Sequence, residues 1–323
     1  MNVLNVLLAR VGLRMVRIDR DRNTVAPPRD TTFTVGGQEL IVQSDSPLLA
    51  AYRVFPNYMA ELGRIASMVY GKYPGMTAVD VGAHVGDTAS IIRSGCPAPI
   101  VCIEGDPSQG RILAMNAARI GGVTVKPLYL SDRSGRAAVT VAKAGSNSTL
   151  LPPGMAGLAT AVEFATLDEA LQDTGLERIK LLKIDTEGFD PKVLRGSERV
   201  LRTGRPAVIF EHNRENLSAI GEDDTSSFLQ LERAGYDSVL LWDAFGRLIL
   251  GTRLSQRQIV EDLHAYVGFD NVHLSEARYV DVCVFHSQDE DIAARCLARE
   301  RLVRDARPQR TAQVPPFTDV DRV

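Results

Sequence analysis

Cysteine, aromatic residues and excess charge of either sign are all scarce in this sequence. Its 323 residues include four cysteines, which are scattered and have no histidine pattern beside them, so a disulfide scaffold is excluded and a zinc site is unsupported. We therefore predict a reducing compartment, the cytoplasm. The 37 Lys and Arg against 40 Asp and Glu give a net charge of -3, and there is one Trp. A protein that binds nucleic acid through a basic groove and stacking platforms is not expected from these numbers.

Long apolar runs and phosphate-binding glycine motifs are also missing. The opening MNVLNVLLAR (1–10) is apolar, but Arg14 and Arg17 follow soon after it and no small-residue cleavage site appears. We predict an amphipathic helix there, since a membrane span needs about 20 apolar residues. Neither Gly-x-Gly-x-x-Gly nor Gly-x-x-x-x-Gly-Lys-Ser/Thr occurs. Nicotinamide and flavin enzymes and nucleotide triphosphatases are therefore disfavoured.

Short apolar runs alternate with helical stretches between residues 77 and 211. The runs are TAVDV, IVCIE, VTVKPLYL, IKLLKI and PAVIFE. Continuous apolar runs are typical of strands buried on both faces, so we predict an α/β fold with a mostly parallel, Rossmann-like sheet. Crossover helices are expected at 85–94, 107–120 and 190–201, the second with Asp106 as its N-cap.

Other segments flank or interrupt this pattern. Before it, we predict a β-hairpin at 32–43 around Gly36-Gly37 and a helix at 57–70. Within it, we predict a hairpin at 131–142 turning near Gly135, a loop at 145–157 and a capping box from Thr166 to Glu169. After it, we predict a helix at 225–234, a strand pair near 236–250, a final strand at 279–286, an Arg-rich helix from 289 and a disordered tail at 305–323.

The predicted domains follow from these elements. They are an N-terminal extension at 1–70 that serves as a lid or in dimerisation, a catalytic domain at 71–288, and the C-terminal helix and tail at 289–323. Apolar helices at 1–15 and 57–70 would be exposed on such an extension, so we expect a homodimer.

The first chemical signal is VDVGAHVGDT (79–88), which places an acid and then glycines at the carboxyl end of the first strand. Ligands bind at this end of the strands in open α/β sheets. Gly82 and Gly86 allow a tight turn and a close approach to the backbone, and the following helix offers N–H groups to an anion such as a carboxylate. Glu104 ends the second strand, where its carboxylate can accept hydrogen bonds from both hydroxyls of a ribose.

A carboxylate placed to bind a ribose, without a glycine motif that binds pyrophosphate, indicates S-adenosylmethionine as the ligand. Asp80 would balance the ammonium of its methionine end through water, and Ser131-Asp132 would meet the adenine. His84 either supports the glycine turn or takes part in the chemistry. The predicted cofactor-binding residues are Asp80, Gly82, His84, Gly86, Thr88, Glu104, Ser131 and Asp132.

The second signal is LLKIDTEGFDPKVLRG (181–196), which puts Asp185 and Glu187 just past the fourth strand. Together with TLDEAL (166–171) and FEHN (210–213), it resembles the FkbM family of S-adenosylmethionine-dependent methyltransferases over roughly residues 76–286. The resemblance implies a class I methyltransferase fold and methyl transfer to oxygen, mostly on sugar or polyketide hydroxyls. It also implies that Asp185, Glu187 and Glu211 face the acceptor.

Two ways of activating the acceptor hydroxyl are compatible with these residues. His212, or one of Asp185, Glu187 and Glu211, would take the proton as general base. Alternatively, Asp185, Glu211 and either His212 or Asn213 would hold Mg²⁺ or Mn²⁺. His212 has a third interpretation, as a structural hydrogen-bond donor to a neighbouring loop.

A different class of function also remains open at this point. The same fold could belong to a non-catalytic nucleoside-binding or scaffold protein, although acids at several strand ends argue for an enzyme. A nucleic-acid methyltransferase ranks last, because no Asn-Pro-Pro-Tyr or Pro-Cys element follows the fourth strand. We predict a small-molecule or oligosaccharide acceptor and no transmembrane segment.

Overall fold

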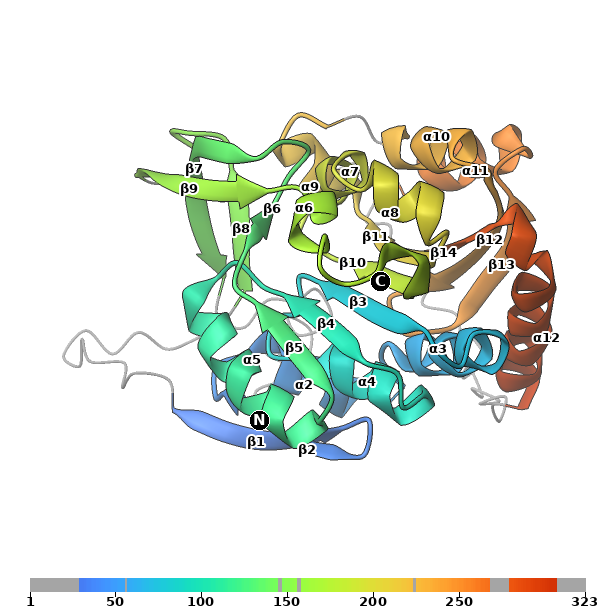
Figure 1. The fold of residues 1–323 in the computed structure, drawn as a ribbon, viewed down its shortest axis with the longest axis horizontal. Helices are drawn as coiled ribbons and strands as arrows, with labels where there is room; N and C mark the ends of the chain where they lie inside the picture. Colours follow the sequence, from blue (N-terminus) through green and yellow to red (C-terminus); the bar gives the residue numbers. More distant parts are fainter. Residues whose placement is uncertain are drawn as a thin grey trace, which may run out of the picture.

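The computed structural model describes residues 29–55, 57–144, 147–155, 158–222, 225–267 and 279–306. The predicted helix at 1–10 and most of the tail at 305–323 lie outside these residues. Within them, no helix is long and apolar enough to cross a membrane. Figure 1 shows a large central sheet with helices on both sides and a smaller sheet beside it.

The central sheet has the strand order β13-β12-β14-β11-β10-β3-β4-β5. The strands are β3 (Thr77–Val81), β4 (Ile100–Ile103), β5 (Val123–Lys126), β10 (Ile179–Ile184), β11 (Ala207–His212), β12 (Tyr236–Asp243), β13 (Leu248–Arg253) and β14 (Val280–His286). Strands β5, β4, β3, β10 and β11 are parallel, and β14 and β13 run against them. The predicted mostly parallel, Rossmann-like sheet is confirmed.

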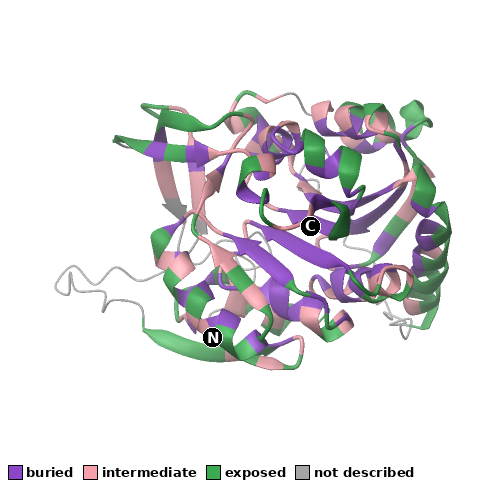
Figure 2. Cartoon of the chain, in the orientation of Figure 1, coloured by how far each residue is buried: buried purple, intermediate pink, exposed green. Residues whose placement is uncertain are grey.

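Helices cover both faces of this sheet (Figure 1), and Figure 2 shows the central strands coloured as buried. Adjacent residues on a strand point to opposite faces. Leu181 of β10 accordingly packs in one hydrophobic core, and Leu182 packs in the other. The first core is covered by α3 (Ala60–Lys72), α4 (Asp87–Gly95), α5 (Pro107–Ile120) and α12 (Glu290–Ala306). The second is covered by α6 (Leu167–Ala170), α7 (Asp190–Arg195), α8 (Glu198–Thr203), α10 (Ser226–Arg233) and α11 (Arg257–Tyr266).

Local sequence signals account for several element ends. The hairpin of β1 (Asp30–Val35) and β2 (Gln38–Gln43) turns at Gly36 and Gly37, whose φ angles of 58° and 78° suit a type I′ turn. Asp106 caps α5 by accepting from the backbone N–H groups of Ser108 and Gln109, as predicted. Thr166 and Glu169 form the predicted capping box at α6.

Helices α3 and α12, which belong to the predicted N-terminal and C-terminal extensions, pack in a hydrophobic core of the central sheet. Helix α3 buries Leu62 and Ile65 in the same cluster as Trp242 of β12 and Ile292 of α12. Arg64 of α3 also forms an ion pair with Glu300 of α12. The apolar face expected to be exposed at 57–70 is therefore buried, so it gives no support to a dimer. The apolar residues at 1–15 lie outside the described residues.

The largest difference from the predicted elements is the small sheet between β5 and β10. It has the order β6-β9-β7-β8, from β6 (Tyr129–Leu130), β7 (Gly135–Ala144), β8 (Asn147–Leu151) and β9 (Ala159–Ala165). The run VTVKPLYL splits at Pro127, which has no N–H to donate to a strand ladder, so β5 ends at Lys126 and β6 begins at Tyr129. The predicted hairpin at 131–142 is wrong, because Gly135 begins β7, which pairs with β8 and β9. Strand β8 occupies much of the predicted loop at 145–157.

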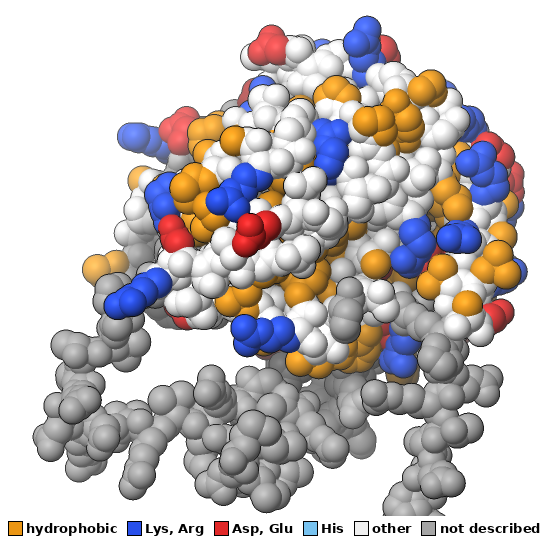
Figure 3. Space-filling model, turned by 90° about the horizontal axis from the view of Figure 1, so that it is seen from below, with side chains coloured by type: hydrophobic (Ala, Val, Ile, Leu, Met, Phe, Trp, Pro, Cys, Tyr) orange, Lys and Arg blue, Asp and Glu red, His pale blue; other side chains and the backbone are white. Residues whose placement is uncertain are grey.

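The remaining elements are short or connect the larger ones. They are α2 (Pro47–Val54), α9 (Arg214–Ala219) and the single turns Leu176–Arg178 and Ser287–Asp289. The predicted helix at 190–201 is split into α7 and α8 at Gly196, where a Cβ atom would lie 2.4 Å from the Ser131 carbonyl oxygen. In the face that Figure 3 shows, Lys and Arg side chains are dispersed among apolar and acidic ones rather than gathered into one basic surface.

Candidate active site

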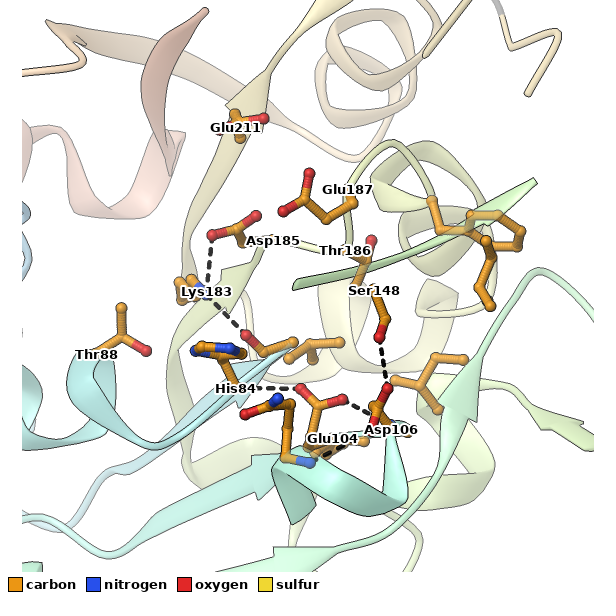
Figure 4. Close-up of a pocket in the computed structure, with 18 of the residues that line it drawn as sticks. His84, Thr88, Glu104, Asp106, Ser148, Lys183, Asp185, Thr186, Glu187 and Glu211 are labelled. Atoms are coloured by element: carbon orange, nitrogen blue, oxygen red, sulfur yellow. Dashed lines mark hydrogen bonds and ion pairs between the residues drawn. The ribbon is translucent and has the colours of Figure 1, made fainter. Parts of the chain in front are cut away.

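A cavity of about 380 Å³ opens at the carboxyl ends of β3, β4, β10 and β11. Strand β3 is the point where the chain order reverses, because β4 pairs on one side of it and β10 on the other. Such switch points are the usual ligand crevices of open α/β sheets. Figure 4 shows that the side chains come from separate strand ends and converge on one space. Leu48, Tyr58 and Met59 of the N-terminal segment complete the wall.

The turn after β3 brings the backbone against this cavity. Gly82 has φ +70°, and a Cβ atom there would lie 1.8 Å from the Asp185 carbonyl oxygen, so only glycine fits. His84, which also has positive φ, lies on the cavity wall. Gly86 caps α4 behind the wall, where a Cβ atom would press on Leu113 at 3.0 Å. It shapes the turn without lining the cavity.

Backbone strain is concentrated around the cavity. The described non-glycine residues with positive φ are Met59, His84, Glu187 and Arg205, and the first three line the cavity. Such conformations cost on the order of 1–3 kcal/mol each and persist where the surrounding structure fixes them. The strain indicates that these side chains are held in place for a purpose other than stability.

Glu104 is fixed in the cavity by two backbone donors. Its Oε2 accepts from the His84 N–H at 2.9 Å and its Oε1 from the Asp106 N–H at 2.7 Å. Burial raises the pKa of Glu104 to about 7, although these hydrogen bonds favour the ionised form. Each carboxylate oxygen keeps a second lone pair for a ligand. Beside it, Ser148 of the small sheet donates to Asp106 at 2.5 Å and covers this end of the cavity.

Asp80 lies below the cavity rather than in its wall, which corrects its predicted role. Its side chain is fully buried, and Thr88 Oγ1 donates to its Oδ2 at 2.6 Å. The Lys183 ammonium lies 3.4 Å from its Oδ1 and 3.4 Å from Asp185 Oδ2. Lys183 thus balances Asp80 from within the protein. Burial lowers the pKa of Lys183, but attraction to Asp185 and Asp80 outweighs burial and raises it overall.

Carboxylates gather at the opposite end of the cavity from Glu104. Asp185, Glu187 and Glu211 all line it, as the resemblance implied. Asn216 donates to Glu187 Oε2 at 3.0 Å, and Asn213 donates to Glu211 Oε1 at 3.0 Å. Burial, followed by the charges of Asp185 and Glu187, raises the pKa of Glu211 well above its usual range. The raised pKa favours the protonated form of Glu211 at this end of the cavity.

His212 does not reach the cavity. Because it follows Glu211 on the same strand, its side chain points to the opposite face of the sheet. It is buried there, with Nε2 3.2 Å from His264 Nδ1 and its ring 5.1 Å from that of Phe228. Its predicted catalytic and metal-binding roles are wrong for this geometry. Among the described residues, no group of three or more His, Cys, Asp or Glu is placed to hold a metal ion.

Ser131 and Asp132 also lie away from the cavity. They follow β6 of the small sheet, and Asp132 forms an ion pair with Arg195 at 3.3 Å. The predicted adenine contact fails because Pro127 ends β5 four residues earlier than the apolar run does. Leu128, Tyr129 and Leu130 line the cavity instead.

Several lining residues were not predicted from the sequence. They include Lys183, Asp106, Gln109, Tyr58 and Tyr279. Lys183 had a usable signal, because a lysine inside a strand that is otherwise apolar needs a buried partner. Tyr58 and Tyr279 come from segments far apart in the sequence, so their meeting depends on the tertiary fold.

Comparisons with known proteins agree with the predicted family. A family model for the methyltransferase FkbM domain matches residues 80–238. Among solved structures, methyltransferase FkbM from Methylobacillus flagellatus KT is similar with 16% identity and a TM-score of 0.35, covering 49% of this chain and 36% of its own. An O-methyltransferase from Bacillus cereus, solved in complex with SAH, is 12% identical with a TM-score of 0.36, covering 75% of this chain and 91% of its own.

The structural likenesses are too distant to carry an argument about chemistry, and this chain spans about a third of the length of the M. flagellatus protein. No curated protein matches the chain. The family match instead covers the strands and turns that build the cavity, from Asp80 at the end of β3 to β12. Residues 80–238 of the chain therefore match the methyltransferase FkbM domain, which supports methyl transfer as the activity.

Proposed function

We propose that this methyltransferase uses S-adenosylmethionine to methylate a hydroxyl of a sugar, oligosaccharide or polyketide-type acceptor. The observation that carries the proposal is one cavity with a buried acid for a ribose at one end and a group of carboxylates at the other. When bound, S-adenosylmethionine supplies an electrophilic methyl group on a sulfonium. The protein's own residues must bind it, orient the acceptor and manage the acceptor proton.

The residues present fit this cofactor. The cavity volume of about 380 Å³ is in the usual range for small-molecule sites. Its described lining carries Asp87, Glu104, Asp106, Asp185, Glu187 and Glu211, with Lys183 as the only Lys or Arg. Such an excess of acids favours a cationic ligand. We assign Glu104 to the ribose hydroxyls, and the surroundings of Asp106, Tyr129 and Ser148 to the adenine.

The carboxylate end is assigned to the acceptor. Asp185, Glu187 and Glu211 can each accept a hydrogen bond from a sugar hydroxyl, and Asn213 can donate one. Fixing a hydroxyl in line with a methyl donor supplies much of the acceleration in a displacement reaction. Tyr58 and Tyr279 also line the cavity, and tyrosine rings are suited to contact the apolar face of a sugar.

Glu211 is the general base in this proposal. In the ligand-free protein burial and the neighbouring carboxylates raise the pKa of Glu211, which favours its protonated form. A cationic ligand in the same cavity lowers the pKa of a nearby acid, so Glu211 loses its proton when the cofactor binds. It then accepts the proton of the acceptor hydroxyl.

The test is methyl transfer from labelled S-adenosylmethionine to a panel of sugars and hydroxylated polyketides. Glu211→Gln and Asp185→Asn should each lower turnover by about 10²–10⁴ while S-adenosylhomocysteine binding is kept. Glu177→Gln, an exposed change of the same kind, is the control. Full turnover in both site variants would refute the assignment of a general base. Cofactor binding without methyl transfer to any acceptor would favour the non-catalytic alternative.

The predicted cytoplasmic location stays a proposal. Its support is that Cys96, Cys102, Cys283 and Cys296 are all free and buried, as expected in a reducing compartment.

A further inference from the structure

The first turn of α9 lies beside the acceptor end of the active site. Asn213 is the N-cap of this helix, and Asn216 follows it three residues later. Both asparagines line the active-site cavity. Each of them contacts one of the carboxylates assigned to the acceptor, because Asn213 donates to Glu211 and Asn216 donates to Glu187. The position of this helical turn therefore fixes part of the acceptor end.

Asn213 joins the helix to the general base through the two ends of its amide. Its Oδ1 accepts from the Asn216 backbone N–H at 3.3 Å, and its Nδ2 donates to Glu211 Oε1 at 3.0 Å. These two partners determine which way the amide points, because a flipped amide would set its N–H groups against the Asn216 N–H and its oxygen against a carboxylate. The cap of α9 therefore determines where the donor to Glu211 lies.

Asn216 makes the corresponding contact with Glu187. Its Nδ2 donates to Glu187 Oε2 at 3.0 Å. Glu187 has a φ of 53°, and a Cβ atom on Gly188 would lie 2.7 Å from the Asn216 carbonyl oxygen, so the turn after β10 packs closely on α9. One helical turn thus holds both acids, which Figure 4 shows at the same end of the cavity.

The hydrogen bond from Asn213 favours the charged form of Glu211. Burial raises the pKa of Glu211 most, the charges of neighbouring acids raise it further, and the bond from Asn213 lowers it. The bond lowers the pKa because an N–H group donates more strongly to a carboxylate than to a neutral carboxyl group. The titratable groups that interact with Glu211 are Asp185, Glu187, Asp281 and Tyr279, and Lys183 is paired with Asp185. Asn213 thus supplies a fixed, uncharged donor beside a group of acids.

We propose that Asn213 is a positioning residue for the general base. Its amide, oriented by the cap of α9, holds the Glu211 carboxylate at the acceptor end and stabilises the charged form in which Glu211 can take the acceptor proton. The proposal rests on the proposed function, because it assigns Asn213 to the base of that reaction.

The decisive variant is Asn213→Asp. Aspartate has nearly the same shape and still caps α9, but it cannot donate to Glu211 and it adds a charge beside that residue. Both changes make Glu211 harder to ionise. In the pH profile of kcat, the half-maximum on the acidic side should therefore rise by about one pH unit or more. Turnover above this limb should return to within about threefold of wild type, since the ionised base still accepts the proton.

The variant Asn213→Ser separates the lost donor from the added charge. Serine is neutral and a good N-cap, but its side chain is one atom shorter and does not reach Glu211. It should move the half-maximum in the same direction by a smaller amount than Asn213→Asp. If Asn213→Asp does not fold, Asn213→Ser decides the test by itself.

Two control variants show whether the effect is specific to this bond. Asn216→Ala removes the amide that holds Glu187 but keeps the backbone N–H that donates to Asn213, so it should not move the half-maximum upward. Gln172→Glu is an exposed amide-to-acid change after α6, and it should leave the half-maximum within about 0.3 pH unit of wild type. An upward shift in either control as large as that in Asn213→Asp would overturn the proposal.

A second measurement does not depend on activity. In ligand-free protein labelled with ¹³C at the glutamate carboxyl carbons, the Glu211 signal is identified by its loss in Glu211→Gln. Its titration midpoint should rise in Asn213→Asp and in Asn213→Ser, for the same reason as the half-maximum of kcat. An unchanged midpoint in both variants, or a loss of turnover that is equal at every pH, would overturn the positioning role.

Failure of the proposed function gives a different result. If wild-type protein transfers no methyl group to any acceptor but the Glu211 midpoint still rises in both Asn213 variants, the effect of Asn213 on the charge of Glu211 stands and the proposed reaction falls. If Glu211→Gln lowers turnover but neither Asn213 variant moves the midpoint or the half-maximum, the positioning role falls alone.

Discussion

Replacement of Lys183 by methionine should destabilise the protein strongly. The Lys183 side chain is 3% exposed and that of Asp80 is 0% exposed, with Nζ and Oδ1 3.4 Å apart. Removal of one partner of a buried ion pair leaves an uncompensated charge, which costs about 3–5 kcal/mol. Asp185 adds less to this loss, because its side chain is 38% exposed and water can solvate it.

A double-mutant cycle measured by urea unfolding separates this pair from general packing effects. Asp80→Asn alone leaves Lys183 beside Asp185 and should cost less than Lys183→Met. The two changes together should cost less than their sum by about 2 kcal/mol, because the second removes the charge that the first left unpaired. Lys180→Met on the same strand, whose ammonium donates to the Gly204 carbonyl at 2.6 Å, is the control.

The pH dependence of the Lys183→Met variant gives an independent check. Without the ammonium, the pKa of buried Asp80 rises further, so the folded variant binds a proton that the unfolded chain has already lost. The difference in the free energy of unfolding between wild type and the variant should therefore become smaller as the pH falls from about 7 to about 5. A loss below about 1 kcal/mol in Lys183→Met, or strict additivity in the cycle, would refute the assignment of Lys183 as the internal counter-charge.

The other variants address the turn, the buried acid on α3 and the histidine behind the sheet. Gly82→Ala should abolish S-adenosylhomocysteine binding in calorimetry, because its Cβ atom would lie 1.8 Å from a backbone oxygen. Gly37→Ala is the control: its φ is +78° but nothing lies within 4 Å of the added Cβ atom, so it should lower the free energy of unfolding by only about 1–2 kcal/mol and keep binding. The free energy of unfolding of the ligand-free protein should fall between about pH 5 and pH 8, since burial raises the pKa of Glu61 to about 7 from 4.5 and the folded state holds the extra proton. Glu61→Gln should make that fall smaller without removing it, because burial also raises the pKa of Glu104 to about 7, and a wild-type profile that rises through neutral pH would contradict the assignment. His212→Asn should lower the melting temperature but leave the pH profile of methyl transfer unchanged, and a displaced profile would return His212 to the mechanism.

The central strands could be predicted because their signal is local. Strands such as β3 are buried on both faces, so an unbroken apolar run marks them. Asp106 before Pro107 likewise fixes the start of α5 with short-range chemistry. The glycine turn and Glu104 follow from the strand ends, because parallel strands bring their carboxyl ends to one edge of the sheet.

The parts that could not be predicted depend on strand register and on distant contacts. His212 follows Glu211 directly, and the alternation of side chains along a strand puts only one of them in the cavity. Ser131 and Asp132 lie away from the cavity because β5 ends before Pro127 and the chain continues into the small sheet. Lys183 could have been noticed, but its partner Asp80 is identified only by the register of β10 on β3.

The most direct test of the central claim is a calorimetric titration of S-adenosylhomocysteine into wild-type protein and the Glu104→Gln variant. The wild-type protein should bind, and the variant should bind about tenfold or more weakly, because a neutral amide loses the charge-assisted hydrogen bonds that the carboxylate makes to ribose hydroxyls, worth roughly 1.5–3 kcal/mol. Absence of wild-type binding would contradict the assignment of the cavity as a cofactor site, and equal affinities would contradict the placement of the ribose at Glu104.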